Sequence, residues 1–311
     1  ITFGKDKIGP DAEITLDLFS KIIWSYRFFI ILITFITSIF SVYYSLSLPN
    51  IYSSKSLIIV GDAEGRAASS LSASYGGIAQ MAGINLGGGM ANKSEIVLET
   101  IRSREFLKNL ITFDSVLPNL MAVDSYDESS NKIIYNKNIY DAKSKSWVRD
   151  APHNRSKIPS YIEAYDYYIK LLNIKFNKIS GFISIEIKHQ SPEFANDLSS
   201  LILNQVNFTA KKDDLNKADD ALYFLNEISK SSQTTEVQEA INYLIANKLK
   251  SKMVASIDAD YLIKVIDAPF IPEKKSLPNR PIICILGFLL GLFASVFLSL
   301  VHNFYLPIKN K

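Results

Sequence analysis

The chain has 311 residues, of which 48% are apolar and 21% are charged, and its formal net charge is +3. This apolar content excludes global disorder, and the small net charge leaves no basic surplus for binding nucleic acid. One cysteine and three widely separated histidines exclude a disulfide framework and the common zinc motifs. We therefore expect no metal, no cofactor and no nucleic-acid partner.

Two charge-free windows indicate the class of protein. No Asp, Glu, Lys or Arg occurs in the 27 residues between Arg27 and Lys55, or in the 28 residues between Arg280 and Lys309. Each window contains an apolar run long enough to cross a bilayer as a helix. Buried core helices are the alternative for both runs, and a cleaved signal peptide is the alternative for the first. The sequence predicts transmembrane helices over residues 28–48 and 281–302.

The charges beside the two runs predict the orientation of the chain. The tails, residues 1–27 and 303–311, both carry basic residues, so the positive-inside rule places both in the cytoplasm. Three basic residues just before the second run argue against this orientation. They belong to a long connection, however, and long connections cross membranes largely regardless of their charge. Residues 49–280 are therefore expected outside the cytoplasmic membrane.

The region after the first run, residues 49–190, is predicted to be an α/β base that begins with a strand at 51–60. Its glycine-rich loop, residues 61–92, holds eight of the thirteen glycines. The loop has no GxxxxGK[ST] pattern, so a phosphate-binding role is disfavoured. It is either a flexible loop or a loop that packs between subunits. The second interpretation uses its scattered apolar residues, Tyr75, Ile78, Met81, Ile84 and Leu86.

The rest of the base is predicted to contain helices and a hairpin. We expect Ser94 to cap a helix whose buried face runs from Val97 to Leu110, and Pro118 to end the next segment. Residues 124–160 have no clear hydrophobic period. Beyond them we expect a helix and then a β-hairpin with one buried face, over residues 160–172, 173–176 and 182–188.

The next region, residues 191–258, is predicted to form a long antiparallel helical hairpin. Ser191-Pro192-Glu193 is a typical helix start, and no Gly or Pro occurs from Glu193 to Ala268. The polar run Ser229–Thr235 predicts the turn, with Thr234 or Thr235 capping the second helix. Paired aspartates at 213–214 and 219–220 lie among lysines, which indicates a solvated helix face rather than a catalytic carboxylate pair.

The chain then returns to the membrane through residues 259–280. These residues contain a strand at 261–267 and a stiff proline-rich lead, made of Pro269, Pro272, Pro278 and Pro281. In the second run, small residues recur every four positions and so share one helix face, namely Gly287, Gly291, Ser295 and Ser299. Small residues let helices approach closely, so we expect a packing face. The alternative is that glycine is simply common in membrane helices.

The order and spacing of these features resemble the polysaccharide co-polymerases, the Wzz-type chain-length determinants of bacterial O-antigen and related surface glycans. The resemblance covers nearly the whole chain. It rests on five segments taken together: Leu48–Tyr52, Ala82–Gly89, Trp147–Arg149, His189–Glu193, and Val265–Pro269 with the prolines that lead to the second run.

The resemblance implies an α+β membrane protein, in which two transmembrane helices flank a periplasmic α/β base with a long protruding antiparallel helical hairpin. It implies an inner-membrane ring of about eight identical subunits that works with an integral-membrane glycan polymerase on a lipid-linked polysaccharide. The small-residue face would then contact the ring or the polymerase. Only ten residues follow Val301, without a Walker motif, so we expect no tyrosine-kinase domain such as some relatives carry.

The sequence favours one of four possible functions. The favoured one is a non-enzymatic scaffold that regulates the chain length of a surface glycan. A capsule or exopolysaccharide export component of related architecture is the main alternative, because it would differ in partner rather than in fold. A two-span sensor is less favoured, since ten residues after Val301 cannot supply an output domain. An enzyme is disfavoured because the sequence has no Ser/His/Asp or metal-binding constellation.

Overall fold

The computed structural model describes residues 16–61, 90–151, 155–231, 235–257 and 261–305. The chain divides into two compact units: a terminal unit of residues 1–50 and 276–311, and a central unit of residues 51–275. Most of the glycine-rich loop lies outside the described residues, and so do Tyr75, Ile78, Met81, Ile84, Leu86 and Thr234.

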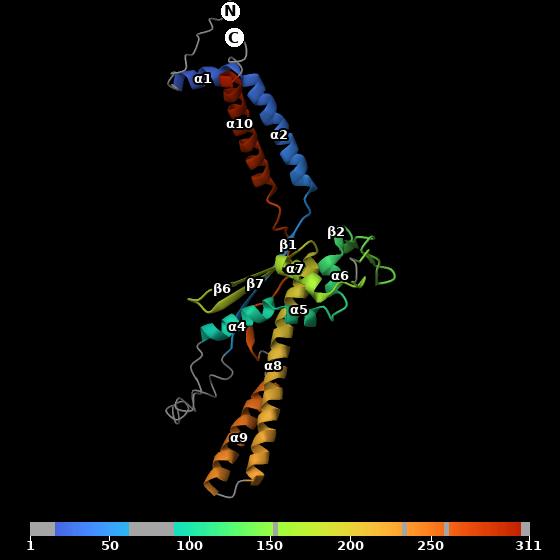
Figure 1. Cartoon of the computed structure of the whole chain (residues 1–311), viewed down its shortest axis with the longest axis vertical. Coiled ribbons are helices and arrows are strands. Elements are labelled where there is room, and N and C mark those ends of the chain that lie inside the picture. Colours follow the sequence, from blue (N-terminus) through green and yellow to red (C-terminus); the bar gives the residue numbers. More distant parts are fainter. Residues whose placement is uncertain (1–15, 62–89, 152–154, 232–234, 258–260, 306–311) are drawn as a thin grey trace, which may run out of the picture. The chain divides into compact units, whose positions relative to one another are not determined.

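Helices form the described part of the terminal unit. They are α1 (Leu16–Ser25), α2 (Arg27–Ser47) and α10 (Arg280–Tyr305). The helices α2 and α10 lie side by side (Figure 1). By length and composition, Arg27–Ser47 and Arg280–Asn303 could each cross a membrane. The two apolar helices expected from the sequence are therefore present, with ends shifted by a few residues. The short helix α1 was not predicted.

A four-stranded antiparallel sheet organises the central unit, in the order β6-β7-β1-β8. Its strands are β1 (Tyr52–Val60), β6 (Leu172–Phe176), β7 (Phe182–His189) and β8 (Ile263–Asp267). The strand β1 has a neighbour on each side, because Tyr52 pairs with His189 of β7 and Val60 pairs with Ile263 of β8. The first strand, the hairpin and the return strand expected from the sequence are thus joined in one sheet.

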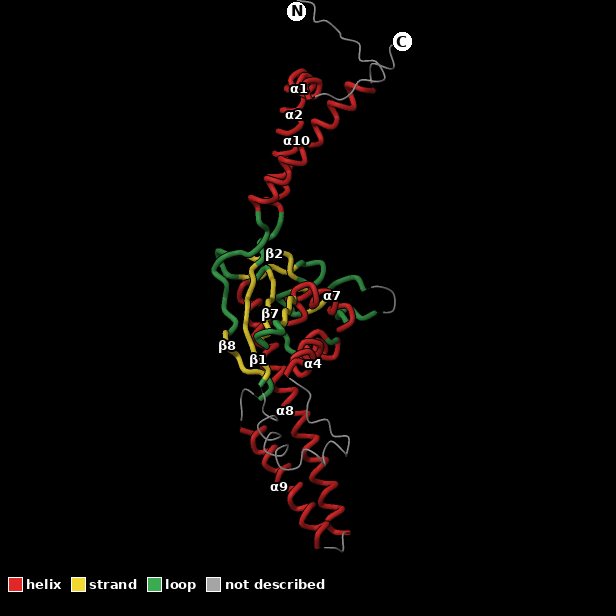
Figure 2. Tube along the Cα trace, turned by 90° about the vertical axis from the view of Figure 1, so that its left-hand side faces the viewer, coloured by secondary structure: helices red, strands yellow, loops and turns green. Residues whose placement is uncertain are grey.

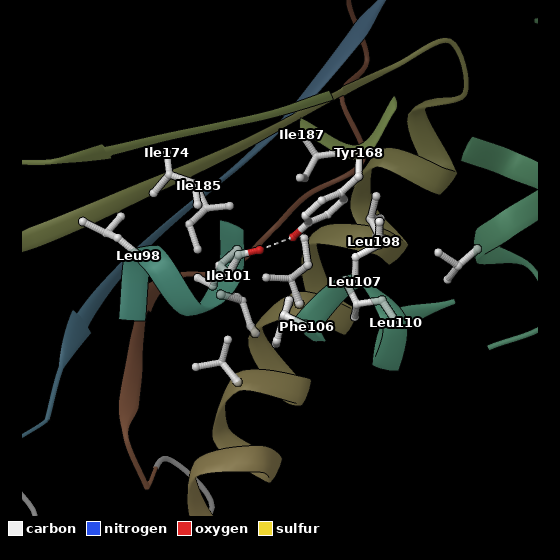
Figure 3. Packing of buried hydrophobic residues seen from close by; sticks show 14 of the residues in the cluster. Leu98, Ile101, Phe106, Leu107, Leu110, Tyr168, Ile174, Ile185, Ile187 and Leu198 are labelled. Atoms are coloured by element: carbon white, nitrogen blue, oxygen red, sulfur yellow. Dashed lines mark hydrogen bonds between the residues drawn. The ribbon is translucent and has the colours of Figure 1, made fainter. Parts of the chain in front are cut away.

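A helical layer packs on one face of this sheet. It contains α4 (Met90–Arg102), α5 (Arg104–Leu110), α6 (Val116–Met121), α7 (Tyr161–Leu171) and the first turns of α8 (Pro192–Ser231). Figure 2 shows the strands on one side of the unit and α4 and α7 on the other. Alternate residues of β7 point into this layer and are fully buried. In Figure 3, Ile185 and Ile187 point towards Ile101 and Tyr168, whose hydroxyl donates to the Ile101 carbonyl at 2.9 Å.

Two boundaries in the helical layer differ from those expected. Ser94 lies inside α4 instead of capping it, and the apolar face from Val97 to Leu110 is shared between two helices. The break falls at Ser103, whose hydroxyl accepts a hydrogen bond from the Phe106 N–H at 3.1 Å and so caps α5. Pro118 lies within the first turn of α6 rather than after it, where its missing N–H is tolerated.

Residues 123–147 form two small hairpins that the sequence did not reveal. They are β2 (Val123–Asp127) with β3 (Lys132–Tyr135), and β4 (Tyr140–Asp141) with β5 (Ser146–Trp147). Their side chains are mostly half-buried or exposed, so no apolar alternation marks them. Both turns contain a residue with positive φ, Asn131 at 51° and Lys145 at 49°.

The helices α8 and α9 (Thr235–Ile257) run antiparallel within the central unit. Two contacts fix their relative direction: Lys252 forms an ion pair with Asp219, and the Lys211 ammonium donates to the Ser256 carbonyl at 2.9 Å. The start of α8 is as expected, because the Ser191 hydroxyl accepts from the Phe194 N–H at 3.2 Å. Thr235 is the first residue of α9.

Candidate interaction surfaces

The small-residue face of α10 lies against α2 of the same chain. Gly291, Ser295 and Ser299 are buried there. A Cβ atom at Gly287 would overlap the side chain of Ser41, and one at Gly291 would overlap the side chain of Thr37. The two glycines therefore let the helix backbones approach more closely than any larger residue would allow.

Polar side chains of α2 face these small residues. The hydroxyls of Thr34 and Ser295 are 3.4 Å apart, and the Ser41 hydroxyl donates to the Ile283 carbonyl at 2.9 Å. Ser45 is also buried in α2. These residues recur at helical spacing, so their pattern in the sequence could have identified α2 as the partner of α10. We call this packed contact between α2 and α10 the seam.

Each end of the seam carries a further hydrogen bond. The Arg280 guanidinium donates to the Asn50 side-chain oxygen at 3.1 Å, and the Tyr26 hydroxyl lies 3.0 Å from Nδ1 of His302. The outward-facing residues of both helices are large and apolar, with Phe28 75% and Leu290 69% exposed. The pair therefore places its small and polar groups inside and its apolar groups outside, as membrane helices do.

The four prolines of the predicted lead have different surroundings. In the central unit Pro269 is half-buried and Pro272 is buried, and the Ser54 hydroxyl donates to the nearby Phe270 carbonyl at 2.8 Å. In the terminal unit, Pro278 follows a cis peptide bond and Pro281 lies in the first turn of α10. The lead therefore ends before Pro281, because proline is tolerated in a first helical turn.

The sheet face opposite the helical layer has a charged centre at Glu186 of β7. Its carboxylate accepts hydrogen bonds from Ser53 at 2.6 Å and from Asn173 at 2.8 Å, and the ammonium groups of Lys55 and Lys188 are each 3.7 Å away. Burial alone would raise the pKa of Glu186, but these hydrogen bonds and lysines lower it below its usual value. Glu186 thus joins three strands on this face, since its neighbours come from β1, β6 and β7.

A shallow cavity of about 370 Å³ lies beside this network. Its lining comes from β1 and from the β6–β7 hairpin and mixes apolar with polar groups: Leu57, Lys175, Phe176, Asn177, Ser180, Phe182 and Ser184. Among the residues that the structure describes, no three His, Cys, Asp or Glu side chains gather in a way that could hold a metal ion.

His189 is buried at the junction of β7, α6 and α8. Its Nε2 donates to the Asn119 carbonyl at 3.0 Å, and its Nδ1 accepts from the Ser191 N–H at 3.0 Å. Its ring also packs edge-on against Phe194, with the ring centres 4.6 Å apart. Burial lowers the pKa of His189 to about 4, so the ring is neutral at pH 7 and joins three elements.

The segment Trp147–Arg149 also has structural contacts. The Trp147 ring packs against Tyr140, with the ring centres 5.2 Å apart. The Arg149 guanidinium donates to the Glu163 carboxylate at 2.6 Å and to the Lys157 carbonyl at 2.7 Å. The hydrogen bond from Arg149 lowers the pKa of Glu163. Arg149 therefore ties the loop before α7 to the first turn of that helix.

Several large apolar side chains of α8 and α9 are exposed in the single chain. Large side chains stand out from both helices, among them Phe208, Tyr223, Phe224, Leu244 and Met253, each at least 49% exposed. Charged residues lie between them. Exposed apolar side chains that gather into a patch commonly mark a contact with another protein.

The chain is similar to known proteins in both sequence and structure. Residues 12–112 match the family model described as Wzz, chain length determinant protein. A structure described as a full-length bacterial polysaccharide co-polymerase is 15% identical, with a TM-score of 0.41, over 96% of this chain and 100% of that one. A fragment of WzzB, a polysaccharide co-polymerase from Salmonella Typhimurium, is also 15% identical, with a TM-score of 0.32, over 73% of this chain and 100% of that one. No match was found among curated proteins.

The family match includes the first apolar helix, strand β1 and the helices α4 and α5. It therefore joins the membrane-type helix α2 to the first part of the central unit. The resemblance expected from the sequence is confirmed, because residues 12–112 match the model of the Wzz family of chain length determinant proteins.

Proposed function

We propose that this chain is a non-enzymatic scaffold of the bacterial inner membrane. It would regulate how many repeat units a partner polymerase adds to a surface polysaccharide, such as the O-antigen of lipopolysaccharide or a related glycan. The observation that carries this proposal is the family match, which starts before the first apolar helix and continues into the central unit. The two apolar helices would anchor both ends of the central unit, which would lie in the periplasm.

The buried ionisable groups of the central unit support a structural role. The ring nitrogens of His189 form hydrogen bonds with the backbone of Asn119 and Ser191. The Arg149 guanidinium donates to Glu163 and to a backbone carbonyl. Catalytic acids and bases must instead present their polar atoms to a substrate. These groups act as cross-links between elements, which favours a scaffold over an enzyme.

The exposed apolar side chains of α8 and α9 support assembly into a homo-oligomer. Side chains such as Phe224 and Met253 would be covered if the antiparallel pair, projecting as a hairpin, stood beside the same pair of a neighbouring subunit. The apolar residues of the glycine-rich loop, from Tyr75 to Leu86, would add contacts between subunits. We propose a ring of about eight subunits on the basis of the family resemblance.

The seam suggests how the membrane segments would serve the polymerase. Because Gly287 and Gly291 already contact α2, a polymerase would meet the lipid-facing surface of the α2–α10 pair. The small-residue face would then act indirectly, by setting the distance and angle at which the pair presents that surface.

Deleting the gene tests the proposed function. We expect the surface glycan to be made still, but with a broad length distribution in place of a preferred length, as seen on a gel of the extracted glycan. Expression of the intact chain should restore the preferred length. Complete loss of the polymer would favour the alternative, an export component for capsule or exopolysaccharide.

A further inference from the structure

A cation between two exposed aromatic rings lies where α1 turns into α2. The guanidinium carbon of Arg27 is 5.0 Å from the ring centre of Trp24 and 5.1 Å from that of Phe28. Both rings face away from the protein, with Trp24 72% and Phe28 75% exposed. The arrangement combines cation–π contacts with a guanidinium that faces the surroundings.

The position of α1 fixes this cluster beside the end of the seam. Figure 1 shows α1 lying crosswise to α2 and α10, at the ends of both helices. Ile22 of α1 is only 6% exposed, and the Tyr26 hydroxyl bonds His302 at 3.0 Å. One side of the turn therefore packs on α10, while Trp24 points to the surroundings.

The positive charge of the Arg27 guanidinium favours binding of an anion. Among the residues that the structure describes, Arg27 forms no ion pair, and its guanidinium packs against the two rings. A guanidinium carries donors in a planar fork, which fits two oxygens of a phosphodiester. Stacking on two rings leaves the edge of the guanidinium, where its N–H groups lie, available for such a ligand.

The surroundings indicate which anion would fit this site. The cluster continues into the apolar outer surface of α2, where Ile31 and Phe35 are 62% and 63% exposed. Exposed Trp and Arg at the end of a membrane-spanning helix lie at the level of the lipid headgroups. We propose that Arg27, held between Trp24 and Phe28, binds the phosphate of an anionic phospholipid, and that this contact holds α1 in the membrane–water interface. The inference rests on the membrane insertion proposed above, but not on the role in glycan synthesis.

The two tryptophans of the chain, Trp24 and Trp147, allow a direct test. Trp147→Phe leaves Trp24 as the single tryptophan, whose emission can be excited selectively, and the full chain is then placed in phosphatidylcholine nanodiscs with increasing phosphatidylglycerol. We expect a saturable blue shift of the Trp24 emission, and quenching by lipids brominated near the headgroup. Arg27→Gln should weaken the response to phosphatidylglycerol roughly fivefold, the share expected for one basic residue at an anionic surface.

The chain offers a matched control in Arg104, which stacks on Tyr165 at 5.2 Å in the central unit. Arg104→Gln should leave the Trp24 response unchanged. Native mass spectrometry gives a second readout and does not need Trp147→Phe. The Arg27→Gln variant should retain fewer phosphatidylglycerol molecules than the unsubstituted chain.

Three results would overturn the inference. They are an unchanged response in Arg27→Gln, an equal loss in Arg104→Gln, and an equal shift with inorganic phosphate, which would indicate a soluble anion. A chain that does not insert into the nanodisc contradicts the membrane reading and this inference together. A chain that inserts but does not respond to phosphatidylglycerol contradicts this inference alone.

Discussion

Asn207, in the middle of α8, binds the backbone of Ile263 at the start of β8 in the way that a neighbouring strand would. Its side-chain nitrogen donates to the Ile263 carbonyl at 3.0 Å, and its side-chain oxygen accepts from the Ile263 N–H at 2.8 Å. The same oxygen accepts from the Leu262 N–H at 3.0 Å. Seven residues further along α8, Asp214 accepts a hydrogen bond from the Tyr261 hydroxyl at 2.9 Å. Hydrogen bonds from α8 therefore hold the chain in place where β8 begins.

Replacing Asn207 with Leu should loosen the start of β8. The substitution leaves backbone donors of Leu262 and Ile263 without their partner, which costs about 2 kcal/mol in local stability. Amide hydrogen exchange should be faster at these two residues. Asn204→Leu is the matched control, because Asn204 is exposed on the same helix. Equal protection of Ile263 in both variants would show that Asn207 does not hold the strand.

Replacing both Gly287 and Gly291 with Leu should push α2 and α10 apart at the seam. Each Leu would overlap α2, at Ser41 and at Thr37, so the helices must move apart. Insertion should remain, because Leu favours the bilayer, and the preferred glycan length should be lost. Ala294→Leu is a matched control, since Ala294 is exposed on the same helix. A wild-type length distribution on glycan gels from the double variant would mean that the spacing of the seam has no role in length control.

Acid should destabilise the central unit through His189. Its pKa is about 4 in the folded chain and about 6.5 when unfolded, so the folded state favours the neutral ring. This stability is complete above the unfolded pKa and is lost as the pH falls towards the folded one. The free energy of unfolding should drop by roughly 2 kcal/mol between pH 7 and pH 5.

The variant His189→Gln isolates this effect, because its amide can replace both hydrogen bonds and does not titrate. Urea unfolding of the variant should show little pH dependence over the same range. The lowered pKa values of Glu163 and Glu186 contribute stability that is lost only at lower pH. A drop of the same size in His189→Gln would assign the effect to other groups.

Much of this fold could be predicted because local signals agreed with the final packing. The starts of α7 and α8 were correct, since Ser160 and Ser191 each cap their helix and a glutamate follows in the first turn. The β6–β7 hairpin was correct because its alternation persists and Gly181 takes a positive φ of 73° at the turn.

The predictions were wrong or incomplete where contacts between residues far apart in the sequence determine the local structure. Ser103 carries a capping signal too, but an apolar stripe continues through it, and only packing against the sheet shows that the helix is broken there. The β2–β3 and β4–β5 hairpins are held by polar turns and by aromatic contacts such as Tyr140 with Trp147. The contact between the small-residue face and α2 was not predicted, because the charge-free runs do not show which helix packs on which. The polar positions of α2 have the same spacing.

Removing one exposed aromatic side chain from α8 should weaken self-association. Phe224 is 62% exposed in the single chain, so Phe224→Ser should leave the fold intact while removing apolar area from a contact between subunits. Light scattering of the detergent-solubilised chain should show smaller assemblies. Ile179→Ser, at a fully exposed position in the β6–β7 turn, is the control and should assemble normally. Assemblies of unchanged size in Phe224→Ser would exclude this surface from the contact.

Reporter fusions should place the turn between α8 and α9 and the C-terminal tail on opposite sides of the membrane. A reporter inserted within Ser229–Thr235, between α8 and α9, should be active only in the periplasm. A reporter fused at Asn310 should be active only in the cytoplasm, because two spans return the chain to its starting side. The same compartment for both reporters would refute the proposed topology.

The placement of β1 has a consequence for the synthesis of this protein. The strand directly follows the first apolar helix, yet its two partners, β7 and β8, are made much later in the chain. As the central unit emerges, one edge of β1 stays unpaired until β7 (Phe182–His189) has appeared, and the other stays unpaired until β8, near the end of the unit, has appeared. Such non-local pairing slows folding and exposes strand edges to aggregation. The strand β1 carries serines and a lysine at positions 53 to 56. These polar side chains make the unpaired strand more soluble than a purely apolar strand would be.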